Sequence, residues 1–173
     1  MTEGIINADI RKAETLPSEF YTDNLHFSNQ MEGLGQGLQF VGHTSEFTSD
    51  MTPIPHLELI LNQALLRTNH ASVNLLLSNV CTHRGMLLCQ EKKDGKSIQC
   101  PYHGRTFDRD GTLKHMPGFE NVENFPSASD NLPSLDLKEW FGFEFTTLDS
   151  SVKLESILQP IEQRMDWWLK DLK

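Results

Sequence analysis

At 173 residues the chain has the length of one domain, and 38% hydrophobic and 23% charged residues are ordinary for a globular protein. The net charge of −9 argues against nucleic acid or an anionic membrane surface as a partner. No apolar run approaches the length of a membrane span, and residues 1–12 carry charges where a signal peptide has its apolar core. We therefore expect a cytoplasmic protein.

The first 37 residues predict short helices. Pro17 suits the first position of a helical turn, and Thr22 or Asp23 is expected to cap a second helix that follows. The alternating glycines at 33, 35 and 37 are expected to end that helix, because glycine is unfavourable inside one.

From residue 38 to residue 150 the pattern changes to short apolar segments between turn signals, which predicts strands. The expected strands cover 39–42, 57–66, 73–80, 86–88, 98–100, 105–107, 112–113 and 140–148. Residues 117–134, rich in Pro, Asn and Ser, predict a long irregular connection. Strands this short with turns this frequent predict a mainly β (α+β) fold, a small antiparallel sandwich or barrel.

The last segment is expected to be helical. Leu154, Ile157 and Leu158 share one helical face, but Pro160 would interrupt a single helix, so two short helices are predicted. The expected organisation is a helical segment at 1–37, a β domain at 38–150 and C-terminal helices at 151–173.

Two short stretches carry the candidate chemistry. Cys81 and His83 form C-x-H, and Cys100 and His103 form C-x-x-H, with sixteen residues between them. In an extended segment residues two apart point the same way, and a turn led by Pro101 can direct residues three apart to a common point. Two thiolates and two imidazoles on paired loops suit a binuclear iron–sulfur centre with two sulfur and two nitrogen ligands.

A structural zinc site is the alternative, because zinc uses the same ligand types. Zinc sites more often pair cysteines as C-x-x-C or histidines as H-x3-5-H, whereas each stretch here supplies one of each. Gly85 and Gly104, one after each histidine motif, would let backbone amides approach cluster sulfurs. The third cysteine, Cys89, is expected to be a small buried hydrophobe rather than a ligand.

These stretches resemble the Rieske [2Fe–2S] signature. The resemblance implies a small antiparallel sheet domain with both stretches in loops at its tip. It also implies that Cys81 and Cys100 bind one iron, that His83 and His103 bind the other, and that two sulfides bridge the irons.

Neighbouring positions distinguish the subtypes of this family. Rieske proteins of respiratory and photosynthetic complexes join the two loops by a disulfide, at positions held here by Met86 and Tyr102. They also donate serine and tyrosine hydroxyls to cluster sulfurs, where this chain has Arg105 and Phe107. Fewer hydrogen bonds to sulfur stabilise the reduced cluster less, so the resemblance implies a low reduction potential.

The wider chain resembles the N-terminal part of a ring-hydroxylating (Rieske-type) oxygenase large (alpha) subunit. One departure is Arg105, where those oxygenases commonly have tryptophan. The matching pieces are 20–23, 39–43, 78–81, 100–108, 110–111, 132–133 and 140–143.

This resemblance implies electron transfer from a reductase or ferredoxin, through the cluster, to a mononuclear Fe(II) that activates O2. In the family that iron is held by two histidines and a carboxylate of a C-terminal domain, and neighbouring subunits form trimers. The remaining histidines of this chain form no close pair, so the sequence predicts an oxidoreductase component without its own catalytic iron site.

Three functions follow as alternatives. The first is the Rieske component of a dioxygenase, implied to act in aromatic hydrocarbon catabolism or on another small organic substrate. The second is a stand-alone Rieske ferredoxin, and the third, more remote, is a zinc-binding interaction module. Residues 81–115 hold seven basic and four acidic residues, which either steer an acidic redox partner or merely solvate a hairpin tip.

Overall fold

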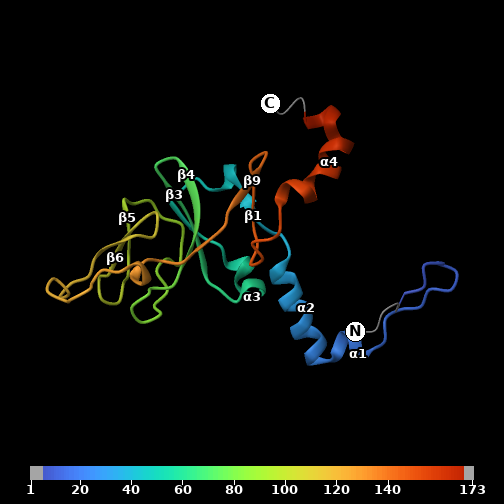
Figure 1. Cartoon of the computed structure of the whole chain (residues 1–173), viewed down its shortest axis with the longest axis horizontal. Coiled ribbons are helices and arrows are strands. Elements are labelled where there is room, and N and C mark those ends of the chain that lie inside the picture. Colours follow the sequence, from blue (N-terminus) through green and yellow to red (C-terminus); the bar gives the residue numbers. More distant parts are fainter. Residues whose placement is uncertain (1–5, 170–173) are drawn as a thin grey trace.

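The computed structural model describes residues 6–169, which form three small antiparallel sheets with helices near both ends (Figure 1). The first sheet has the order β1–β10–β9 (Gln39–His43, Phe143–Thr146, Lys138–Trp140). The second is β2–β3–β4–β8 (Met51–Pro53, Leu65–His70, Val73–Ser78, Ser134–Leu135) and the third β5–β6–β7 (Ser97–Gln99, Thr106–Asp108, Leu113–His115). The predicted mainly β fold of short antiparallel strands is confirmed.

The β3–β4 hairpin lies between two hydrophobic cores, so both of its faces are buried. Leu66 and Leu77 pack into one core with Ile98 and Phe107 of the third sheet. The neighbouring residues Leu65 and Leu76 face the opposite core, which Val41 of β1 also enters. Since side chains alternate along a strand, a strand covered on both sides is a continuous apolar run, as 75–77 is.

The helices lie on the opposite side of the hairpin from the third sheet (Figure 1). Asp23 caps the second helix through hydrogen bonds from two backbone amides, as predicted. This helix continues through Gly33 and Gly35 and ends only at Gly37, so the prediction that all three glycines end it was wrong. The helices are α1 (Glu19–Thr22), α2 (Asn24–Gln36), α3 (Glu58–Leu61) and α4 (Leu154–Leu169), with 3-10 turns η1 (Thr44–Glu46), η2 (Pro55–Leu57) and η3 (Ala128–Asp130).

Residues 57–66 are not one strand. Their first half forms the end of η2 and then α3, and the left-handed Asn62 (φ 50°) ends α3 before β3 begins at Leu65. Leu57 and Leu61, four residues apart, are both buried, so the apolar run has helical spacing that the strand prediction overlooked.

Two other strand predictions also need correction. Residues 86–88 form no hairpin with 98–100; Leu87 makes one isolated bridge with Val80, and β5 pairs with β6 instead. Residues 140–148 turn back on themselves, because Phe141 and Gly142 both have positive φ and join β9 to β10.

The C-terminal segment forms one helix, α4, with Pro160 inside it, so the prediction of two helices was wrong. Burial of Leu154 and Leu158 anchors its first turns. Proline removes only one backbone donor, and the following Glu162–Arg164 stretch has high helix propensity. The predicted segments 1–37 and 151–173 each extend outside the described residues. Within residues 6–169, no helix combines the length and apolarity of a bilayer span.

The turn between β9 and β10 gives a first testable prediction. Gly142 has φ +83°, and a Cβ added there would lie 2.5 Å from Nε2 of His43. Gly142→Ala is therefore expected to lower the free energy of unfolding by at least about 1–2 kcal/mol, measured by urea titration. Gly33→Ala is the matched control: it meets nothing within 4 Å on α2, and we expect about 0.5–1 kcal/mol of added stability. Equal urea midpoints for the two variants would contradict this account.

Candidate metal centre

The two predicted stretches fold into loops of the same design. In the first loop (81–86) the Cys81 amide donates to the Met86 carbonyl at 2.8 Å, and the Gly85 amide donates back to Cys81 at 3.0 Å. In the second loop (100–105) the Cys100 amide donates to the Arg105 carbonyl at 2.8 Å, and the Gly104 amide donates to Cys100 at 3.1 Å.

Glycine has the same place in both loops. Gly85 (φ +69°) and Gly104 (φ +74°) adopt the left-handed conformation that closes each turn, four residues after its cysteine. The histidine positions differ: His83 is two residues after its cysteine, and His103 is three after its own. Although the two turns are similar, each therefore places its imidazole at a different position relative to its cysteine.

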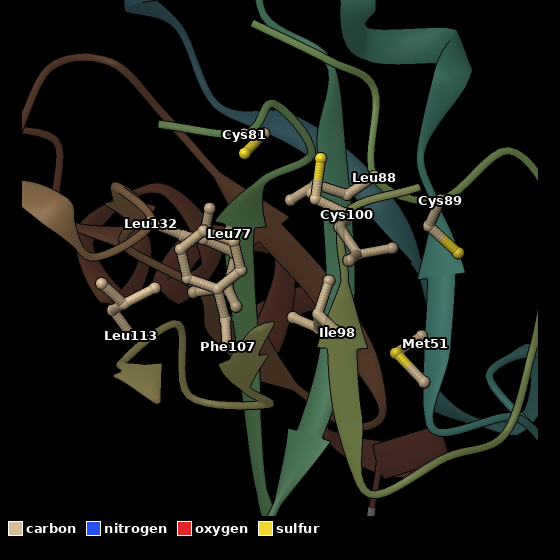
Figure 2. Packing of buried hydrophobic residues seen from close by; sticks show 11 residues of the cluster. Met51, Leu77, Cys81, Leu88, Cys89, Ile98, Cys100, Phe107, Leu113 and Leu132 are labelled. Atoms are coloured by element: carbon tan, nitrogen blue, oxygen red, sulfur yellow. The ribbon is translucent and has the colours of Figure 1, made fainter. Parts of the chain in front are cut away.

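Both loop cysteines are inside the protein. Cys81 is 3% exposed and Cys100 is 2% exposed, and both belong to the core beneath β4, β5 and β6. Their thiols are neighbours, since Cys100 contributes to the raised pKa of the Cys81 thiol. Figure 2 shows their sulfur atoms at one end of this core, with Cys89 apart from them. Cys89 is 2% exposed, so it is buried as expected. Its thiol donates a hydrogen bond to the Glu91 carbonyl at 2.9 Å.

The two imidazoles lie above the thiols, nearer to solvent. The His83 and His103 ring centroids are 5.0 Å apart, His83 is half-buried, and His103 is exposed. The phenol ring of Tyr102 stacks on His103, with 3.7 Å between the ring centroids. The rings of Phe119 and His83 are T-shaped, with 6.2 Å between their centroids. The site thus has a buried sulfur side and an accessible nitrogen side.

The surroundings favour the neutral form of one thiol and one imidazole of the site, through shifts in their pKa values. Burial raises the pKa of the Cys81 thiol, and the neighbouring Cys100 raises it further. Desolvation lowers the pKa of His83, with a further contribution from the positive form of His103. Imidazole binds a metal in its neutral form, whereas two adjacent thiols ionise together only when a cation compensates their charge.

The donor set therefore suits a pair of metal ions. Within residues 6–169, no three His, Cys, Asp or Glu side chains converge closely enough to hold one ion together. The donors instead form a thiol pair and an imidazole pair, as two bridged irons with unlike ligands require.

The sequence did not reveal a partly buried hydrogen-bond network beside the first loop. Arg105 is 3% exposed, and its Nη1 donates to Thr82 Oγ1 at 2.8 Å while its Nη2 donates to Asp130 Oδ1 at 2.7 Å. Thr82 in turn donates to the Asp130 carbonyl at 2.7 Å. One sequence pattern could have pointed to Asp130. Ser127 and Asp130 have the spacing of a capping box, and in the structure each side chain bonds the other's backbone at η3.

Known proteins match this chain across most of its length. A family model described as "Rieske [2Fe-2S] domain" matches residues 38–126. The carnitine monooxygenase oxygenase subunit of Escherichia coli (strain K12) is 35% identical over 144 residues, covering 82% of this chain and 38% of that protein. The chloroplastic choline monooxygenase of Beta vulgaris is 28% identical over 148 residues, covering 81% of this chain and 31% of that protein.

Solved structures agree with these matches. A quaternary ammonium Rieske monooxygenase superposes with a TM-score of 0.76 at 26% identity, covering 90% of this chain and 43% of its own. The chain thus spans less than half the length of these relatives. A [2Fe–2S] cluster is the cofactor of the matched domain. By its family-model match, and with oxygenase subunits as its relatives, the chain belongs to the Rieske [2Fe–2S] domain family.

Proposed function

We propose that Cys81 and Cys100 bind one iron of the cluster, that His83 and His103 bind the other, and that the chain relays electrons. The arrangement of the two loops supports this assignment most directly. They join a buried thiol pair to an imidazole pair near the surface, so the two irons would have different ligands and different solvent access.

The exposed imidazole gives the relay a direction. His103 is exposed and covered on one face only by the Tyr102 ring, so an acceptor can approach the nitrogen-ligated iron closely. The thiol side is enclosed by the core and offers no such approach. Electrons would enter from a reductase or ferredoxin and leave through the imidazole side toward a mononuclear iron oxygenase centre, held by a neighbouring subunit or another domain.

The experiment combines analysis with spectroscopy. Purified protein is expected to contain two irons and two sulfides per chain, and its reduced form is expected to show the paramagnetic resonance of a mixed-ligand cluster. Rapid mixing with a reductase should reduce the cluster, and an oxygenase partner should reoxidise it. A single colourless zinc ion per chain would contradict the proposal.

The substrate class changes in the light of the relatives. The sequence resemblance implied aromatic hydrocarbon catabolism, but the relatives reported above are named for carnitine and choline. An aromatic enzyme, chlorobenzene dioxygenase subunit alpha of Cupriavidus sp. (strain PS12), is 29% identical and matches less of this chain, 76% against 81–82%. We propose that this chain serves a monooxygenase of small quaternary ammonium compounds. Substrate-dependent reoxidation of the reduced complex, with carnitine or choline compared against chlorobenzene, tests that choice.

A stand-alone ferredoxin remains the second candidate. It is supported by the three small sheets around the loops, which correspond to a sheet domain of the size of a simple carrier. Helices α2 and α4 extend beyond that domain and favour the oxygenase component. Both candidates suit a cytoplasmic location, since all three cysteines are free. Transfer of electrons to unrelated acceptors, without any oxygenase subunit, would favour the ferredoxin.

The midpoint potential is a further prediction. Phe107 is fully buried and has no hydroxyl to donate, and Met86 and Tyr102 exclude a disulfide between the loops. We therefore expect a midpoint of roughly −150 to 0 mV, at the low end of the Rieske range, measured by a redox titration. A midpoint above about +200 mV would contradict the argument from missing donors.

A further inference from the structure

Arg105 is a buried cation attached to both loops. Its backbone closes the second loop, since the Cys100 amide donates to its carbonyl at 2.8 Å. Its side chain turns to the first loop and reaches Thr82, the residue between Cys81 and His83. At 3% exposure the guanidinium is shielded from water, so its charge acts on its surroundings with little screening.

The partner of this cation is a carboxylate of the 117–134 connection. Asp130 accepts from Arg105 at 2.7 Å, and its other oxygen accepts from the Ser127 amide and hydroxyl, both at 2.9 Å. These donors lower the pKa of Asp130, so the carboxylate is ionised at neutral pH. Nε of Arg105 has no hydrogen-bond partner within the described residues, so the guanidinium is held by its two Nη groups.

We propose that Arg105 and Asp130 are positioning residues that set the cluster's reduction potential in opposite directions. This inference rests on the proposed function, in which the two loops hold the cluster. Reduction adds one negative charge to the cluster, and a nearby buried cation stabilises that charge while a nearby anion opposes it. Arg105 therefore raises the reduction potential and Asp130 lowers it. In this way Arg105 partly compensates for the absence of hydroxyl donors from the loops.

A purely mechanical clamp makes a different prediction. If the two side chains only fixed the first loop, removing either would loosen the same contact and move the potential in the same direction. Thr82→Val separates the two roles, because it removes one bond from Arg105 and one to Asp130 without changing any charge.

The experiment compares Arg105→Met, Asp130→Asn and Thr82→Val with the unsubstituted protein in redox titrations followed by paramagnetic resonance. We expect a lower midpoint for Arg105→Met, a higher midpoint for Asp130→Asn, and a shift smaller than either for Thr82→Val. Arg105→Lys, which keeps the charge, should recover most of the loss. Lys114→Met is the matched control for removing a cation: its side chain is 56% exposed, so the midpoint should move little.

Shifts of the same sign for Arg105→Met and Asp130→Asn would overturn the inference, as would unchanged midpoints. If Arg105→Met does not fold, Asp130→Asn and Thr82→Val decide the question together. The charge role predicts a higher midpoint for Asp130→Asn and a clearly smaller shift for Thr82→Val, whereas a clamp predicts similar shifts for both. If the unsubstituted protein holds a cluster and the two variants shift its midpoint in the same direction, the charge role of Arg105 is refuted but the proposed function stands. Absence of a cluster from the unsubstituted protein refutes both.

Discussion

Replacing Cys81 or Cys100 by serine is expected to abolish cluster binding, so that purified protein loses its bound iron, its sulfide and its visible absorption. In the proposed assignment each thiolate is one of two on the same iron, and a serine hydroxyl is a poor substitute because it ionises far less readily. The loss should be close to complete for either variant, measured as iron per chain.

The third cysteine provides a matched control. Cys89 is as buried as the other two, at 2% exposure, and belongs to the same core. Its thiol bonds the Glu91 carbonyl, and it lies apart from the sulfur pair (Figure 2). Cys89→Ser should therefore retain two irons per chain. Equal iron loss in all three variants would mean that core disruption, rather than loss of a ligand, is responsible.

The two loops of the candidate site could be predicted because the pattern that forms them is local, whereas their role as cluster ligands stays a prediction. The spacing of Cys81 and His83, and of Cys100 and His103, is a property of two short stretches, and the glycine that closes each loop follows at a fixed distance. The fold class was also predictable, since the apolar segments and turn signals of residues 65–78 and 105–115 correspond to observed strand pairs.

The errors came from patterns with two physical interpretations. Residues 57–66 are apolar whether they form a strand or a helix followed by a strand, and the left-handed Asn62 that separates the two is visible only in the structure. Around Phe141 the alternation of aromatic residues continues through a two-residue turn, so periodicity alone gives no sign of the reversal.

Arg105 shows what sequence could not provide. Its position was recognised as a departure from the oxygenase pattern, but its partners lie 23 and 25 residues away along the chain. Which distant carboxylate meets a buried arginine depends on how the 117–134 connection folds over the loops. No local pattern determines that contact.

An ion pair with both side chains buried shows how tertiary structure can make one charge indispensable. Arg67 of β3 and Glu144 of β10 join the first and second sheets at 2.9 Å, with side chains 4% and 1% exposed. Asn74 also donates to Glu144 at 2.7 Å, and the Arg67 guanidinium lies 4.6 Å from the Phe47 ring centroid. Glu144→Leu would leave the arginine charge buried without its partner.

We expect Glu144→Leu to lower the free energy of unfolding by about 3–5 kcal/mol, measured by urea titration, because an uncompensated buried charge is strongly destabilising. The double variant Arg67→Met/Glu144→Leu should recover much of that loss, since it removes both charges. Asp9→Asn is the control: its pair with Arg11 has the same 2.9 Å separation, but those side chains are 30% and 84% exposed. Removing that exposed pair should change the free energy of unfolding far less than Glu144→Leu does. Similar losses for Glu144→Leu and Asp9→Asn would show that burial does not decide the strength of this contact.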